Sequence, residues 1–183
     1  MGFGKNDFSL CQSILDAVAT PVIQISPDRI IQMINDSALQ VLDLTRDQAI
    51  GRACYELFRT DDCDGGECAT VRAMREKRKI DGETCAHIRG KDIPIHYYAS
   101  PLFDDSGEVI GAVEYFEDLT ELKKKEEDLK RISNEIQGVL NGVATPVIAI
   151  DTSQKITHIN KAGAVLFQKR PQELIGTICH TIF

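Results

Sequence analysis

The sequence predicts an α+β fold in which short helices gather on one side of a five-stranded antiparallel sheet. Two short strand patterns and several short helices come first, and from Ile80 onward apolar and polar residues alternate with a period of two. Residues 14–58 also align without a gap with residues 139–183, at a constant offset of 125. A gap-free repeat at a fixed offset indicates a duplicated module, so the first part of the fold is expected to recur.

The first half of the module is predicted to combine one long helix, a hairpin and three short helices. Apolar side chains recur on one helical face over residues 7–18. Pro27-Asp28 is turn chemistry between two short strand patterns, and Asn35-Asp36-Ser37 supplies capping side chains for the helix that follows. The strands are expected at 21–26 and 30–34, and the short helices at 38–42, 46–51 and 54–58.

The second half of the module is predicted to be a helix followed by a three-stranded meander. A polar, Gly-bearing loop over 61–68 separates the last short helix from a helix over 69–77. Turn residues at 89–91 and 104–107 then divide the alternating region into three strands. These strands are expected at 80–88, 93–103 and 109–116.

Residues 118–138 change character, being rich in Lys and Glu and free of Pro. Aliphatic residues there and just beyond fall on the a and d positions of one heptad frame, which predicts a helix that pairs with a second copy of itself. The alternative is a single amphipathic helix that packs on its own domain. The aliphatic positions are Leu119, Leu122, Leu129, Ile136, Leu140 and Val143.

These patterns divide the chain into three parts. A complete domain is expected over 7–120, a helical linker over 118–138, and the N-terminal part of a second domain over 139–183. The second copy stops where the first continues for some 60 residues, so we expect a truncated second module and a chain that is a fragment.

Composition limits the function classes. The formal net charge of −7 argues against nucleic acid as the main partner. No apolar run approaches the roughly 18–20 residues that span a bilayer, and no signal peptide opens the sequence. We therefore expect a cytoplasmic piece without membrane contact, whether or not a longer parent is membrane-anchored. The six cysteines are then expected to be reduced thiols.

Several of these segments, in this order, resemble a PAS sensor module. They are Thr20-Pro21-Val22-Ile23, Ile34-Asn35-Asp36-Ser37-Ala38, Ile50-Gly51 and the terminal segment 109–120. The resemblance covers residues 10–120 fully and 137–183 as the first half of a second, tandem PAS. The stretch from Gly51 to Met74 further resembles a Cys-bearing PAS subgroup of methyl-accepting chemotaxis proteins and sensor histidine kinases of anaerobic bacteria and archaea.

The resemblance implies a sensor that binds a ligand or cofactor between the sheet and the helices. Asp118, Leu119 and Thr120 match the family's Asp-Ile-Thr signature, with Leu for Ile, which implies a relay into a signalling helix and an output domain of the parent protein. The pocket candidates are Ile23, Ile34, Leu42, Leu57, Phe58, Met74, Tyr97 and Val113. The same residues would equally form a filled core. A homodimer through the N-terminal and connector helices is expected.

Four cysteines leave three interpretations open. Cys54, Cys63 and Cys68 are spaced C-x8-C-x4-C, and Cys85 follows on the first strand of the meander. Together they could hold a metal ion or an iron–sulfur cluster. Cys63 and Cys68 could instead be a redox pair on an acidic loop. In the third interpretation the thiols are structural, which the recurrence of Cys54 as Cys179 favours.

Other cofactors and catalysis are not expected. The resemblance would place a heme b ligand on the central helices, but no His lies between Leu39 and Arg78. A C-x-x-C-H motif for c-type heme and the Cys segment of a LOV-type flavin domain are both missing. His87 and His96 are expected to be ordinary sheet residues. No catalytic motif is present, so this is expected not to be an enzyme. Two functions stay open: a sensor of a ligand, cofactor or redox state, and a ligand-free interaction module that sets dimer geometry.

Overall fold

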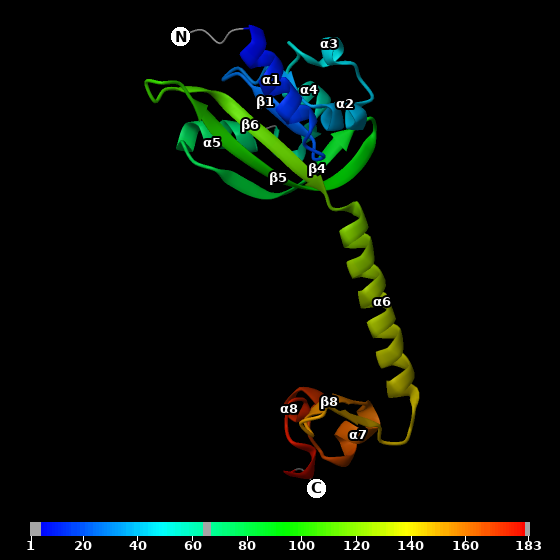
Figure 1. The fold of residues 1–183 in the computed structure, drawn as a ribbon. Coiled ribbons are helices and arrows are strands. Elements are labelled where there is room, and N and C mark those ends of the chain that lie inside the picture. The colour runs from blue at the N-terminus through cyan, green and yellow to red at the C-terminus, as the bar shows by residue number, and fades with distance from the viewer. Residues whose placement is uncertain (1–4, 64–66, 182–183) are drawn as a thin grey trace. The chain divides into compact units, whose positions relative to one another are not determined.

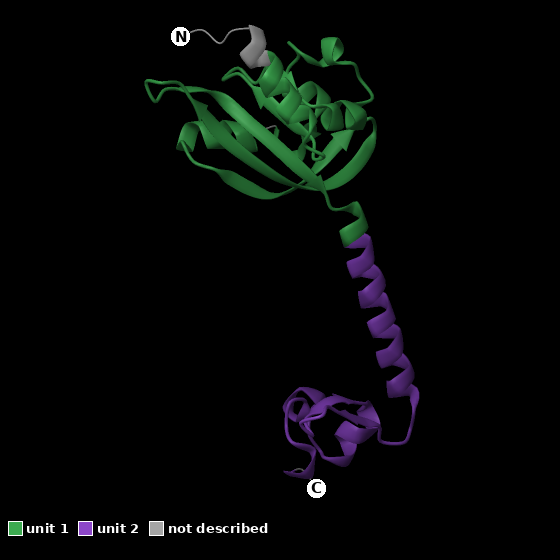
Figure 2. Cartoon of the chain, viewed as in Figure 1, with its two compact units in different colours: residues 1–122 green, residues 123–183 purple. Residues whose placement is uncertain are grey.

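The structure is a computed structural model that describes residues 5–63 and 67–181 (Figure 1). The chain divides into two compact units, unit 1 over residues 1–122 and unit 2 over 123–183 (Figure 2). Across the part of the chain that the structure describes, no helix combines the length and apolarity needed to cross a membrane.

Unit 1 is built on one curled antiparallel sheet with the strand order β2-β1-β6-β5-β4-β3 (Figure 1). The first hairpin, β1 (Val22–Ile25) and β2 (Ile31–Ile34), is joined by β1 to the meander strand β6. The meander strands are β4 (Ile80–Ile88), β5 (Lys91–Phe103) and β6 (Val109–Asp118). The α+β fold is therefore confirmed.

A short strand that the sequence did not predict, β3 (Arg59–Thr60), adds a sixth member at the edge of the sheet. Arg59 pairs with His87 and Thr60 with Ala86 on β4. Two residues are too few to show a period-two pattern, so only the partner strand identifies β3. The following 3₁₀ turn, η1 (Asp61–Cys63), begins the predicted loop, whose residues 64–66 lie outside the described residues.

The meander hairpin is tighter than predicted. β4 and β5 are joined by Arg89 and Gly90 alone, both at positive φ (52° and 72°), which is the geometry that a two-residue hairpin needs. β5 therefore begins at Lys91 rather than at residue 93.

The helices of unit 1 supply the other layer of the core. They are α1 (Lys5–Asp16), α2 (Asp36–Leu42), α3 (Arg46–Ala49), α4 (Cys54–Leu57) and α5 (Ala69–Glu76). Side chains from α2 to α5 meet the inner face of the sheet, where Ile25, Ile88 and Ile95 are fully buried. This burial is what holds the short helices in place, because helices of four to eight residues are marginal in isolation.

Asn35 links the end of α1 to the sheet. Its side-chain amide donates to the carbonyls of Leu15, Val18 and Thr20 at 3.2, 3.0 and 2.8 Å. Its Oδ1 accepts from the N–H groups of Val22 and Ala38. The residue is fully buried, so all five bonds form away from water, and they fix how the chain leaves α1 and enters α2.

Unit 2 repeats this local arrangement. It holds α6 (Thr120–Gly142, from residue 123 onward), the hairpin β7 (Ile148–Ile150) and β8 (Ile156–Ile159), α7 (Lys161–Leu166), α8 (Pro171–Leu174) and the turn η2 (Cys179–Thr181). α6 runs four residues beyond the predicted 118–138. Its end is fixed by Asn160, whose amide donates to the carbonyls of Leu140, Val143 and Thr145.

Candidate functional site

The candidate site is a small cavity between the inner face of the sheet and α4, α5 and η1. It has a volume of about 20 Å³ for the centres of water molecules, which is room for one or two waters. Three predicted pocket residues, Ile23, Phe58 and Tyr97, line it. Thr60, Asp62 and Glu114 add polar groups to the same wall.

The other predicted pocket residues lie elsewhere. Ile34 and Leu42 are buried in the packed core, while Leu57 and Met74 are partly buried against it. Val113 does not line the cavity, because neighbouring residues of a strand face opposite sides and its neighbour Glu114 points inward. The prediction placed β6 one residue out of phase, which exchanges the two faces of a strand.

Three of the four predicted cysteines, Cys54, Cys63 and Cys68, line the cavity as free thiols. Cys54 begins α4, Cys63 ends η1, and Cys68 is the N-cap residue of α5. The thiols of Cys63 and Cys68 lie close enough at this wall to shift each other's pKa, while the Cys63 sulfur also contacts the Thr60 N–H at 3.3 Å and the Phe58 carbonyl at 3.9 Å. The structure therefore brings together the pair that the redox interpretation requires.

The two thiols of this pair have opposite acidities. The neighbouring Cys63 thiol lowers the pKa of Cys68 to about 5, and the Thr70 hydroxyl, 3.3 Å away, and the first N–H groups of α5 act in the same direction. The neighbouring Cys68, with burial, raises the pKa of Cys63 well above its usual range, although Thr60 donates to its sulfur. The favoured state is thus a Cys68 thiolate beside a neutral Cys63 thiol.

Glu114 and Cys54 respond to the same environment. Burial, and then the negative charge of Cys68, raise the pKa of Glu114 to about 8. Burial, followed by the charges of Glu114 and Cys68, raises the pKa of Cys54 to about 12. Cys54 is therefore a neutral, buried thiol, as the structural interpretation of that residue expects.

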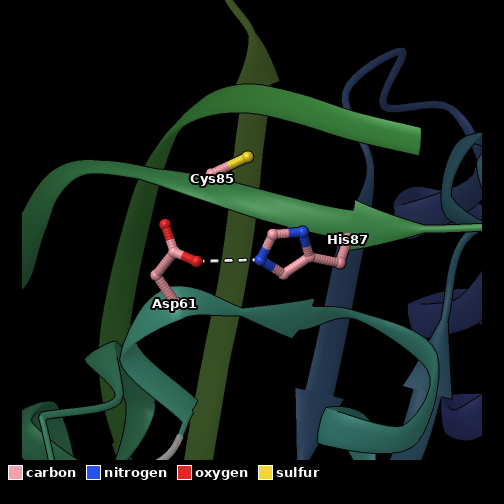
Figure 3. Close-up of side chains that lie close together, drawn as sticks. All are labelled: Asp61, Cys85 and His87. Carbon is pink, nitrogen blue, oxygen red and sulfur yellow. Dashed lines mark hydrogen bonds and ion pairs between the residues drawn. The ribbon is translucent and has the colours of Figure 1, made fainter. Parts of the chain in front are cut away.

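Cys85 is separated from the other three cysteines. Ala86 lines the cavity, so Cys85, the preceding residue of β4, faces the opposite side of the sheet. There it lies with Asp61 and His87, and one ligand atom of each falls within 4.8 Å of the others (Figure 3). Among the described residues this is the only group of three metal-binding side chains so close, so the predicted four-cysteine site is divided between two faces.

His87 is held by two carboxylates. Its Nδ1 lies 2.8 Å from Asp92 Oδ1 and its Nε2 lies 2.8 Å from Asp61 Oδ1. The bonds to Asp92 and to Asp61 raise the pKa of His87. His96, on β5, stacks on Tyr98 and takes no part in this group.

The predicted relay residues form the junction between β6 and α6. Asp118 Oδ1 accepts from the Thr120 N–H at 2.8 Å, which caps the first turn of the helix. Leu119 is buried, and its N–H donates to the Pro94 carbonyl of β5 at 2.8 Å. The start of α6 is therefore attached to the sheet two strand residues beyond Phe116, which lines the cavity.

Sequence reasoning missed Thr60, Asp62 and Glu114 at the cavity and Asp61 and Asp92 beside His87. The sequence did carry a signal for Glu114, because it lies between the apolar residues Ala112 and Phe116 on the same, buried face of β6. The others reach their positions through the pairing of β3 with β4 and of β4 with β5, which no local pattern reports.

Comparison with known proteins identifies the class. A family model described as PAS fold matches residues 15–124, more than half of the chain, and a second model with the same description matches residues 134–180. The chain therefore belongs to the PAS fold family. Neither model describes an enzyme family. A search of curated proteins gives no match.

Solved structures share the fold at low sequence identity. A PAS domain from Colwellia psychrerythraea has a TM-score of 0.55 and 18% identity, covering 62% of this chain and 98% of its own. A PAS domain from a two-component sensor histidine kinase has a TM-score of 0.50 and 12% identity, covering 62% and 97%. The VqmA dimer of Vibrio cholerae has a TM-score of 0.50 and 14% identity, covering 64% and 53%. PAS domains are typical of sensor and signal-transduction proteins.

Proposed function

We propose that unit 1 is a sensory module of a signal-transduction protein, and that its signal is the oxidation of Cys63 and Cys68 to a disulfide. The observation that carries the proposal is that these two thiols line the same wall of the cavity, close enough to shift each other's pKa. Cys68 is the attacking group, because the thiolate is the reactive form of cysteine. Cys63 is the resolving group, since its thiol lines the same wall of the cavity.

The oxidant is a hydroperoxide. The Cys68 thiolate attacks one peroxide oxygen, the O–O bond breaks, and Cys68 becomes a sulfenic acid while the other oxygen leaves as hydroxide or alkoxide. Cys63 sulfur then attacks the Cys68 sulfur, the sulfenic hydroxyl leaves, and the Cys63 proton makes it water. Two electrons pass from the two sulfurs to the O–O bond, and a disulfide remains.

Oxidation removes the negative charge of Cys68 from the cavity. That charge is one of the two causes that keep Glu114 protonated, so its loss favours the carboxylate on β6. β6 continues through Asp118, Leu119 and Thr120 into α6. A change at the cavity can shift α6 only as far as it stabilises one arrangement of this junction over another.

The partner proposed for α6 is a second copy of the chain. Its heptad aliphatics are exposed in the structure, Leu129 at 68% and Ile136 at 54%. A parallel pairing would bury this stripe, and an output domain of a parent protein such as a sensor histidine kinase or a chemotaxis receptor would read its geometry. Light scattering at tens of micromolar protein tests this pairing. We expect the natural chain to be a dimer and Leu129→Asp to weaken it. A natural chain that is monomeric, with a mass that Leu129→Asp does not change, would contradict the pairing.

The test of the thiol proposal is peroxide treatment of the reduced full chain, followed by mass spectrometry and hydrogen exchange. We expect the mass to fall by two hydrogens, with Cys63 linked to Cys68 and altered exchange in α6. Cys68→Ser should abolish the reaction, whereas Cys63→Ser should stop at a sulfenic acid that dimedone traps. Cys11→Ser, at an exposed thiol, is the control that should change nothing. A disulfide with another cysteine as the main product would refute the proposal.

A second candidate function is a ligand-free interaction module that sets dimer geometry. The cavity volume of about 20 Å³ favours it, because pockets for small organic ligands measure roughly 300–1,000 Å³. The same experiment separates the two. If the disulfide forms but changes neither the hydrogen-exchange rates in α6 nor the oligomeric mass, the result would support the interaction module.

A further inference from the structure

The outer face of the sheet carries a second group of reactive side chains at the edge formed by β3, η1 and β4. Cys85 and His87 are two residues apart on β4 and therefore point to the same side. Thr60 faces the cavity opposite Ala86, so the next residue, Asp61, falls on the outer side beside them. Figure 3 shows the Asp61 carboxylate facing the His87 ring below Cys85.

A fourth residue orients the imidazole. Asp92 stands opposite His87 in the β4–β5 ladder, and its carboxylate lies 2.8 Å from Nδ1. A metal-bound histidine usually donates its second ring N–H to such a carboxylate, which fixes the tautomer and the direction of the ring. Binding of a cation needs the tautomer with its proton on Nδ1, and the ion would replace the present hydrogen bond between Nε2 and Asp61 Oδ1, which lie 2.8 Å apart.

We propose that Asp61, Cys85 and His87 form a binding site for one Zn²⁺ ion, with Asp92 as the carboxylate that orients His87. One sulfur, one nitrogen and one oxygen ligand suit a borderline-soft cation, and the fourth position is left for water. A tetrahedral ion places its ligand atoms about 3.3–3.6 Å apart, so atoms already within 4.8 Å need only side-chain adjustments.

The site is separate from the thiol pair, since Cys85 lies across β4 from the cavity. Its chemistry is also different: metal binding needs Cys85 deprotonated and His87 neutral but changes no oxidation state. Zn²⁺ would join η1 to β4, and η1 also carries Cys63, whose thiol lines the cavity on the inner side of the sheet. The proposal does not depend on whether Cys63 and Cys68 form a disulfide.

The experiment is titration of the untagged, reduced full chain with Co²⁺, followed by displacement with Zn²⁺. We expect one equivalent to bind at tens of micromolar protein, with a thiolate-to-cobalt charge-transfer band and the visible bands of a tetrahedral ion. Cys85→Ser should remove the charge-transfer band. His87→Gln and the exposed Asp61→Asn should each weaken binding at least tenfold, and Asp92→Asn by roughly 10–100-fold.

The matched controls are Cys11→Ser, the double variant Cys63→Ser with Cys68→Ser, and His96→Gln, all of which should bind Co²⁺ as the natural chain does. Circular dichroism of each variant separates lost ligands from lost fold, and Asp61→Asn, on an exposed side chain, is the variant least able to unfold the domain. The proposal is overturned if no stoichiometric complex forms. It is equally overturned if the band survives Cys85→Ser and disappears in the Cys63 and Cys68 double variant.

Discussion

Asn35 in unit 1 and Asn160 in unit 2 make the same five hydrogen bonds, 125 residues apart. Both hairpins also have the same register, Ile23 opposite Ile34 and Ile148 opposite Ile159, with a bulge at the same place. Burial nevertheless differs. Ile25 is 0% exposed, whereas its equivalent Ile150 is 51% exposed.

The reason for the difference is the second neighbour of the hairpin. In unit 1, β1 also pairs with β6, and the meander completes the core. Within the described residues of unit 2, β7 pairs with β8 alone, and the buried cluster consists of Ile156, Ile159 and Leu174. The repeated segment therefore encodes its own hydrogen bonding, but the burial of its apolar face depends on strands outside it.

All four tyrosines lie in unit 1, and the chain has no tryptophan. Tyrosine fluorescence therefore reports the unfolding of unit 1 alone, while hydrogen exchange over residues 148–159 reports unit 2. These two probes let matched substitutions be compared between the units.

The largest effect is expected for Asn35→Ala. It leaves several buried peptide groups unpaired, each at a cost of roughly 1–3 kcal/mol, so the free energy of unfolding of unit 1 should fall by about 4 kcal/mol or more. Urea titration with tyrosine fluorescence measures it. Asn160→Ala should leave this transition unchanged while it speeds exchange in β7 and β8. Equal loss of tyrosine signal in both variants would show that the units do not unfold independently.

The next largest effect sharpens the contrast in burial. Ile25→Ala removes a fully buried side chain and should lower the free energy of unfolding of unit 1 by about 2–5 kcal/mol. Ile150→Ala, at a half-exposed position in the same local structure, should change the stability of unit 2 by less than about 1 kcal/mol, read by hydrogen exchange. A comparable cost at both positions would mean that unit 2 buries Ile150 in solution against a partner.

Glu114 has no equivalent in the described part of unit 2 and makes the stability of unit 1 depend on pH. In the unfolded chain the Glu114 carboxyl has its ordinary pKa of 4.5. In the folded chain its pKa is about 8, so it keeps its proton to a higher pH. Its contribution to stability is thus complete below about pH 4.5 and is lost as the pH rises to 8, by at most about 1.4 kcal/mol per pH unit.

The measurement is urea unfolding of the natural chain and of Glu114→Gln between pH 5 and pH 8. The other titratable groups that line the cavity are common to both proteins: Cys54, Asp62, Cys63, Cys68 and Tyr97. Among them, the lowered pKa of Cys68 makes stability rise with pH over this range, which is the opposite slope to that of Glu114. The natural chain should therefore lose stability relative to Glu114→Gln as the pH rises. Parallel curves would contradict a raised pKa at Glu114.

The smallest effect concerns an ion pair that only unit 1 has. Arg46 contacts Asp16 at 2.7 Å and Asp36 at 2.8 Å, whereas unit 2 has Pro171 in place of Arg46 and keeps only the backbone bond from Lys161 to Asn141. Arg46→Ala should destabilise unit 1 by about 0.5–1 kcal/mol at low salt and by less in high salt. Arg52→Ala, which breaks the pair of Arg52 with exposed Glu56, is the matched control and should cost less.

The sequence by itself determined the α+β order of elements, the repeat and the strand boundaries to within a few residues, because apolar periodicity and turn residues are local properties. It also indicated Asn35, whose recurrence as Asn160 marks a position that both units need. The pairing of Cys63 with Cys68 was one of its open interpretations. All of these depend on residues close together in the chain, or on a pattern that simply repeats.

Only the tertiary structure decided which side chains meet across strands. β3 exists because β4 offers an edge, and this pairing carries Asp61 to Cys85 and His87 and takes Cys85 away from the other cysteines. The phase of β6, which places Glu114 rather than Val113 in the cavity, likewise depends on its pairing with β1 and β5. Register between distant strands is set by the burial of the whole face, so the pattern of one strand alone does not fix which of its two faces points inward.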